Sequence, residues 1–174
     1  MKKWLITAKE CGFTFAEVID VNTLRPMEVV RDMCAADKCH AYGKNWTCPP
    51  YCGTLEECRE KIRMYSNAIL LQTVAKLEKT IDTKGYAAAE KRHLESFRQF
   101  CRELRREYPN ALCLGAGGCR VCGSCAFPEA CRFPEEATSS MEGYGLFVTR
   151  VCQDNGIEYY HGEKTIAYFA CVLF

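Results

Sequence analysis

Four cysteines lie close together in one glycine-rich stretch, GAGGCRVCGSCAFPEACRFP, at Cys119, Cys122, Cys125 and Cys131. Three thiols with two residues between each pair of neighbours cannot share one face of a helix or strand, but they meet when the backbone wraps around a small object. Glycines at three nearby positions favour such wrapping, because glycine adopts positive φ and lets amides point inward. The C-x2-C-x2-C spacing matches three corners of a ferredoxin cubane, and a fourth cysteine close to a proline completes the pattern. The stretch therefore favours an iron–sulfur cluster, with zinc and an unliganded or disulfide state as alternatives.

A second group of cysteines lies in the segment CAADKCHAYGKNWTCPPYC, at Cys34, Cys39, Cys48 and Cys52. Pro49 and Pro50 fix φ and stiffen the chain beside these thiols, and the aromatic residues of the segment indicate a packed loop. A rigid loop with four thiols is suited to hold a second [4Fe-4S] cluster. Cys58 follows a few residues later and is an alternative to Cys52 as the fourth ligand.

The other groups that could do chemistry are few. His40, beside Cys39, is the one histidine that is a candidate ligand or proton donor, and His93 is expected to be a surface or hydrogen-bonded histidine. No phosphate-binding G-x-x-x-x-G-K-[ST] motif occurs, and cysteines rather than a helix follow the glycines at 115–118, which argues against a dinucleotide site. Catalytic residues are therefore not indicated. Four further cysteines lie on apolar faces and are expected to be inert core residues, namely Cys101, Cys113, Cys152 and Cys171. Cys11 has no informative context.

The composition describes an ordinary globular chain with an unusual number of thiols. Its 174 residues are long enough for one domain, and 1–174 is expected to be a single metal-binding domain. The formal net charge of +1 argues against nucleic acid and anionic membranes as partners. The 14 cysteines, without a signal-like or membrane-spanning apolar run, indicate a reducing cytoplasm where clustered thiols mean metal or redox chemistry.

The hydrophobic pattern predicts a chain that alternates between strands and helices. A stripe of apolar positions with steps of three and four marks the longest helix, which ends at Pro109. Thr54 is a candidate N-cap, and Ser139 with Glu142 has the spacing of a capping box. These signals predict an α/β or α+β fold with a single sheet covered by helices and two cysteine-rich cluster-binding loops. The expected elements are strand 13–21, a short helix after Pro26, helix 55–65, strand 68–74, helix 86–108, strand 111–114, helix 140–154 and a final hairpin over 158–174.

The motifs YGKNWTCPP, GGCRVCGSC, CRFPE and SSMEGYG together resemble an uncharacterised family of small cysteine-rich proteins described as predicted metal-binding, from anaerobic bacteria and archaea. The resemblance extends from about Arg31 to Phe174. It implies a metal site at Cys34, Cys39 and Cys48, whereas the position of Cys52 is often not cysteine in the family. A three-cysteine site with an open iron corner is therefore an alternative to an all-cysteine site.

Three functions are compatible with this pattern. In the first, the chain carries two [4Fe-4S] clusters and transfers electrons in anaerobic metabolism, together with a redox partner protein. In the second, one cluster has an open iron and the chain is a small enzyme. In the third, zinc stabilises a binding module and supplies folding free energy. The sequence indicates no oligomeric state.

Overall fold

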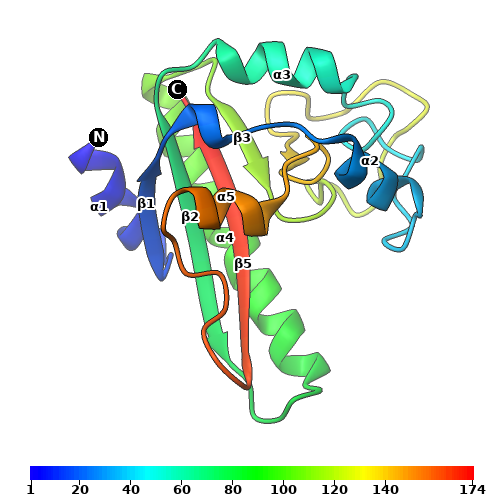
Figure 1. Ribbon diagram of the computed structural model, residues 1–174. Helices are drawn as coiled ribbons and strands as arrows, with labels where there is room; N and C mark the ends of the chain where they lie inside the picture. The colour runs from blue at the N-terminus through cyan, green and yellow to red at the C-terminus, as the bar shows by residue number, and fades with distance from the viewer.

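The computed structural model describes all 174 residues as a mixed α+β fold with one five-stranded sheet, as expected (Figure 1). The strands are β1 (Phe15–Ile19), β2 (Ala68–Lys76), β3 (Leu112–Gly115), β4 (Ser139–Ser140) and β5 (Thr165–Leu173). The helices are α1 (Lys2–Glu10), α2 (Glu28–Ala35), α3 (Leu55–Arg63), α4 (Thr83–Glu107) and α5 (Val148–Asp154), with a 3-10 turn, η1 (Val21–Thr23). None of the helices has the length and hydrophobicity needed to cross a membrane.

The strands are arranged in the order β1-β2-β5-β3-β4. The first four in this order pair antiparallel, and only β3 and β4 are parallel. The C-terminal strand β5 therefore lies in the centre of the sheet, as its nearly continuous apolar sequence predicts. The parallel pair has consequences for the cysteine loops, because it places the chain just after Gly115 beside the chain just after Ser140.

A separate hydrophobic core covers each face of the sheet. On one face Ala170 and Val172 of β5 pack with Trp4 of α1 and with Phe100 and Leu104 of α4. On the other face the alternate residues of β5 pack against α5 and the turn before it. Figure 1 shows this arrangement, with α4 behind the long strands and α5 in front of them. Cys101 is a buried core residue of α4, as expected from its place in the apolar stripe.

Three local predictions need correction. Helix α1 is absent from the predicted elements because the apolar pattern of its sequence is weak, and in the structure only Trp4 and Ala8 of its residues are buried. The helix expected over 140–154 is only α5, since Ser139–Ser140 form β4 and Gly145, with φ +76°, ends the turn that follows. A final hairpin does not form, because β5 pairs with β2 and β3 instead of with 158–161. The predicted N-cap at Thr54 is confirmed, and it forms a full capping box with Glu57.

Candidate metal centre

Three thiols of the first cysteine loop line one cavity of about 210 Å³. Cys34 lies in the last turn of α2, Cys39 follows in the loop and is exposed, and Cys48 is buried. The chain reverses between them at Asp37 and His40, which both adopt positive φ. The Asp37 carboxylate stabilises this bend, because it accepts a hydrogen bond from the backbone N–H of Tyr42 at 2.9 Å and forms an ion pair with Lys44 at 2.7 Å. The loop is thus held by local contacts in the shape that directs these thiols to one cavity.

The opposite wall of this cavity comes from the other end of the chain. It consists of residues that directly follow the two parallel strands, namely Gly117 and Gly118 after β3, and Ser140, Glu142 and Gly143 at and after β4. Glu142 is the only carboxylate among the lining residues. Glu142 is an exposed residue, but the protein around its carboxyl still desolvates it, and this desolvation raises the pKa of the Glu142 carboxyl above its ordinary value, against hydrogen bonds with its own backbone and with Ser140. No sequence pattern predicts Glu142 as a site residue.

Burial also governs the thiols of the cavity. Desolvation raises the pKa of Cys34, with a further contribution from Glu142, and desolvation raises the pKa of Cys48 against the opposing hydrogen bond from Asn45. Both thiols are therefore protonated at neutral pH when no metal is present. A metal that binds these thiols as thiolates would release protons.

Cys52 lies outside the residues that line this cavity. Its Sγ is 3.3 Å from the carbonyl oxygen of Gly143, and Cys58 lies near it, with Sγ 3.9 Å from the carbonyl oxygen of Cys52. Arg31 donates from Nη2 to the Gly53 carbonyl at 2.8 Å and to Cys58 Sγ at 3.3 Å. Burial raises the pKa of Cys52 to about 11, although Arg31 opposes this shift. The predicted fourth ligand thus belongs to a neighbouring group of two thiols and one arginine.

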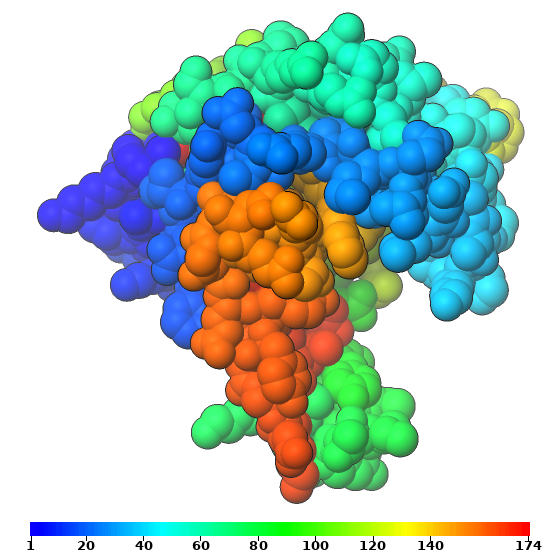
Figure 2. Space-filling model, in the orientation of Figure 1, coloured from blue at the N-terminus to red at the C-terminus, as the bar shows by residue number.

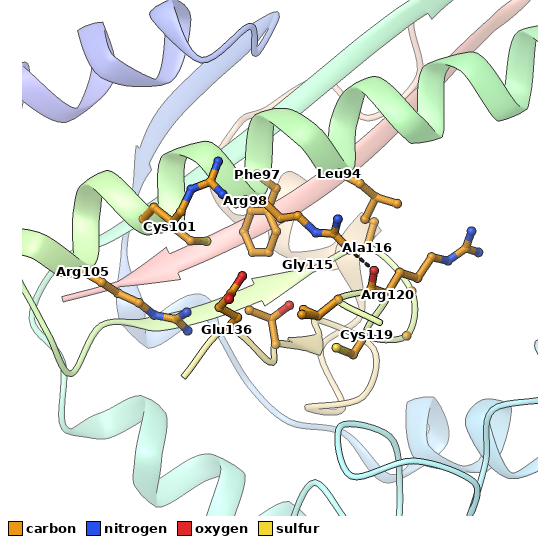
Figure 3. Close-up of a pocket in the computed structure, with 15 residues that line it drawn as sticks. Leu94, Phe97, Arg98, Cys101, Arg105, Gly115, Ala116, Cys119, Arg120 and Glu136 are labelled. Carbon is orange, nitrogen blue, oxygen red and sulfur yellow. Dashed lines mark hydrogen bonds between the residues drawn. The ribbon is translucent and has the colours of Figure 1, made fainter. Parts of the chain in front are cut away.

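The second cysteine loop, residues 116–138, is closed at its base by the pairing of β3 and β4. Helix α4 holds it at both ends, as Figure 3 shows in part: Arg98 donates to the carbonyl of Arg120, and Arg105 donates to the carbonyl of Glu135 at 2.6 Å. Arg120 also forms an ion pair with Glu90 of α4 at 2.8 Å. These contacts attach the loop to the long helix.

The four thiols of this second loop are only partly covered by protein. Cys119, Cys122 and Cys131 are half-buried, and Cys125 is exposed. Within the loop Arg132 donates to the carbonyl of Ser124, which ties the segment before Cys125 to the segment after Cys131. No three histidine, cysteine, aspartate or glutamate side chains anywhere in the chain lie close enough together to hold a single metal ion. The predicted quartet thus shares one closed loop without meeting at one point.

The two cysteine loops contact each other directly. A Cβ added to Gly118 would lie 3.5 Å from Cys48 Sγ, and the backbone N–H of Cys119 donates to Thr47 Oγ1 at 3.4 Å. Trp46 of the first loop donates from Nε1 to the carbonyl of Glu129 in the second loop at 2.8 Å. An aromatic cluster completes the contact, with ring centroids 4.7–5.7 Å apart among Trp46, Tyr51 and Phe127.

The remaining thiols and histidines lie apart from this contact. Cys58 is buried, and so are the others, Cys11, Cys101, Cys113, Cys152 and Cys171. His40 is exposed, next to Cys39. His93 is fully buried, so the surface alternative is wrong, and its Nδ1 lies 2.9 Å from Thr73 Oγ1.

On its other side the first cavity adjoins a second groove, which runs between α2 and α5. Cys34, Cys39 and Glu142 line both spaces, and the groove continues to Leu146 and Val148. Figure 2 shows the two segments that form it side by side on one face of the molecule. The first site therefore has an approach from solvent.

Comparisons with known proteins give a single match. No curated protein and no solved structure matches the chain. A family model described as "Predicted metal-binding protein (DUF2284)" matches residues 17–174, which is nearly the whole chain. Together with 14 cysteines, of which two groups lie in adjoining loops, this match supports metal binding. The chain belongs to this family of predicted metal-binding proteins.

Proposed function

We propose that this chain is an iron–sulfur protein that holds two [4Fe-4S] clusters and transfers electrons. Cys34, Cys39 and Cys48 hold the first cluster, for which the sequence predicts Cys52 as the fourth ligand. The second cluster is held by Cys119, Cys122, Cys125 and Cys131. Thiolate-bound cubanes accept and donate single electrons with little rearrangement.

The contact between the two cysteine loops is the observation that carries this proposal. Cys48 of the first loop and Gly118 of the second are neighbours, and Cys119 follows Gly118 directly. Two cofactors bound by such loops would be adjacent, and electron transfer between cofactors becomes faster as their separation decreases. The aromatic contact of Trp46 with Phe127 keeps the loops together.

The arrangement of the thiols also favours a cluster over a single ion. Three thiols surround a cavity of about 210 Å³ instead of meeting at one point. A zinc ion requires four ligands at about 2.0–2.3 Å from a common centre. A cluster of several iron and sulfur atoms places its ligands around a volume. Cysteine thiolates are soft ligands, which iron–sulfur clusters prefer.

A redox partner protein is part of this proposal. Arg98, Arg102 and Arg105 of α4 line the small cavity beside Cys119, and none of the three forms an ion pair. Figure 3 shows Arg98 and Arg105 there, together with Glu136, the one carboxylate of this cavity. This basic surface beside the second loop favours an acidic redox protein, whose association would weaken as salt concentration rises.

Protein purified without oxygen tests the proposal through its iron and acid-labile sulfide content, its optical spectrum and the EPR of its reduced form. We expect about eight irons and eight sulfides per chain, and an EPR spectrum broadened by interaction between two neighbouring clusters. Cys48→Ser and Cys122→Ser should each remove one cluster, and each should remove the broadening. A colourless protein that contains zinc would refute the redox function and leave a zinc-stabilised binding module.

One observation favours a second candidate, a small iron–sulfur enzyme. Only three cysteines line the cavity of the first site, and the groove between α2 and α5 opens next to it. An iron without a fourth thiolate could bind a substrate there. Binding of an exogenous thiol or cyanide to the reduced protein, seen as a change in the EPR spectrum, would support this candidate over a pure carrier.

A further inference from the structure

The first cavity contains one metal-ligating side chain besides its three thiols. Its other lining residues are three glycines, Pro49, and the hydroxyl-bearing Tyr42 and Ser140. We infer that the carboxylate of Glu142 supplies the fourth ligand of the first site, where the sequence predicts Cys52. This inference rests on the cluster proposed above, and it specifies which iron of that cluster is exchangeable.

The backbone of Glu142 is held on both sides. Ser140 of β4 pairs with Gly115 of β3, and the N–H of Met141 donates to the Gly115 carbonyl at 3.1 Å. The N–H of Gly143 donates to Ser140 Oγ at 2.8 Å, and the N–H of Gly145 donates to the Glu142 carbonyl at 2.8 Å. The closed turn therefore fixes Glu142 against the cavity. Cys34 Sγ lies 3.7 Å from the Glu142 carbonyl oxygen, so a candidate ligand is its direct neighbour.

The Glu142 carboxylate interacts with its own backbone and with Ser140, but it has no charged partner. No lysine, arginine or histidine forms an ion pair with it, whereas Glu90 pairs with Arg120 and Asp37 with Lys44. A carboxylate that lines a thiol-bearing cavity without a cation beside it is free to bind a metal. Iron accepts carboxylate oxygen together with sulfur ligands.

Cys52 is less well placed for the same role. Its Sγ faces the Gly143 carbonyl at 3.3 Å, and it does not line the cavity. Arg31 and Cys58 are its neighbours: Cys58 Sγ lies near the Cys52 carbonyl oxygen, and Arg31 donates to Cys58 Sγ. Cys52 would have to leave these contacts to reach the cavity, whereas Glu142 already borders it.

A carboxylate is a harder and more exchangeable ligand for iron than a thiolate. The iron bound by Glu142 is therefore the first that the cluster loses on mild oxidation, and the one that a small molecule with an oxygen or sulfur donor would reach through the cavity. Replacement of Glu142 by cysteine should make all four corners equivalent and remove this lability.

The experiment measures iron per chain and the EPR signal of a three-iron cluster after brief treatment of the purified holoprotein with ferricyanide. We expect Glu142→Ala to lose one iron faster than wild type, and Glu142→Cys to lose it at least about 10-fold more slowly. Cys52→Ser and Glu135→Ala, an exposed glutamate outside the cavity, should match wild type.

The opposite pattern, with Cys52→Ser labile and a folded Glu142→Ala like wild type, would overturn the inference and assign the corner to Cys52. Circular dichroism shows whether Glu142→Ala and Cys52→Ser have folded. If one of these two variants has not folded, the iron loss of the other decides between Glu142 and Cys52 as the ligand. If wild type contains neither iron nor sulfide, the proposed function fails, and Zn²⁺ titration tests Glu142 separately. Glu142→Ala should then weaken zinc binding by at least about 10-fold while Cys52→Ser does not; equal affinities would overturn the inference.

Discussion

Replacement of His93 should flatten the dependence of stability on pH. The imidazole is fully buried in α4, where Phe13 and Phe97 pack against it, and Nε2 has no hydrogen-bond partner. Burial lowers the pKa of His93 to about 4, which outweighs a weaker opposing effect of the Phe169 backbone. The unfolded chain therefore binds a proton between about pH 6.5 and pH 4 that the folded chain excludes, so the free energy of unfolding falls as pH falls through this range.

The magnitude follows from the difference in pKa. A lowering of the pKa from 6.5 to about 4 corresponds to about 3 kcal/mol over the whole range. About 2 kcal/mol of this is already lost at about pH 5, and none is lost above about pH 7.5. Urea unfolding followed by circular dichroism at these two pH values measures the loss. His93→Phe keeps an aromatic ring among its neighbours but removes the titrating group, so it should lose about 2 kcal/mol less than wild type between the two values.

His40→Asn is the matched control, because His40 is exposed and asparagine tolerates its positive φ of 57°. It should retain the pH dependence of wild type. Comparison at equal cofactor content removes any contribution from acid lability of a bound cluster. If His93→Phe and wild type lose the same stability on acidification, the buried neutral histidine is not the cause.

Two further predictions separate ligands from packing residues. Cys101→Ala should leave the metal content unchanged and cost about 1 kcal/mol of stability, whereas Cys122→Ser should lose one cluster. Iron analysis measures the metal content and urea unfolding measures the stability. Loss of metal in Cys101→Ala with full metal content in Cys122→Ser would refute the assignment of ligands. Trp46→Ala removes an aromatic contact with Phe127 of the other cysteine loop and a second one with Tyr51 of its own loop, worth about 1–3 kcal/mol together. Trp46→Ala should accelerate the release of iron to a chelator, whereas the control Tyr160→Ala, at an exposed position, should not. Equal release rates in Trp46→Ala and wild type would show that the aromatic cluster does not stabilise the sites.

Much of the fold was predictable, because several elements carry strong local signals. The N-cap at Thr54, the apolar stripe of α4 and the buried run of β5 each lead to the observed element. The segment after Ser139 was mispredicted because the serine that accepts from a backbone N–H three residues later is Ser140, which bonds Gly143 and closes a turn, instead of Ser139 at the start of a helix. The pairing of Ser139 and Ser140 with β3 favours the turn over a helix that begins at Ser140.

The same misprediction explains why Glu142 was missed as a site residue. As part of a capping box it would have a local role at a helix N-terminus. Its place beside Cys34 depends instead on the parallel pairing of β3 with β4, a contact between segments more than 20 residues apart. From residue type and spacing alone, the thiols of the first loop were predictable as ligands, although Cys52 does not line the cavity with Cys34, Cys39 and Cys48. Their opposite wall was not, because no short-range pattern encodes it.

The strand pair β3–β4 also connects the two cysteine sites mechanically. Gly117 and Gly118, which begin the second loop, form part of the cavity of the first site. Any metal or cluster that orders one loop therefore restrains a wall of the other site. Because binding to a site that is incomplete in the unfolded chain contributes to folding free energy, we expect the two sites to stabilise each other. Electron transfer between them would then take place in a unit whose geometry is set by the sheet and by α4.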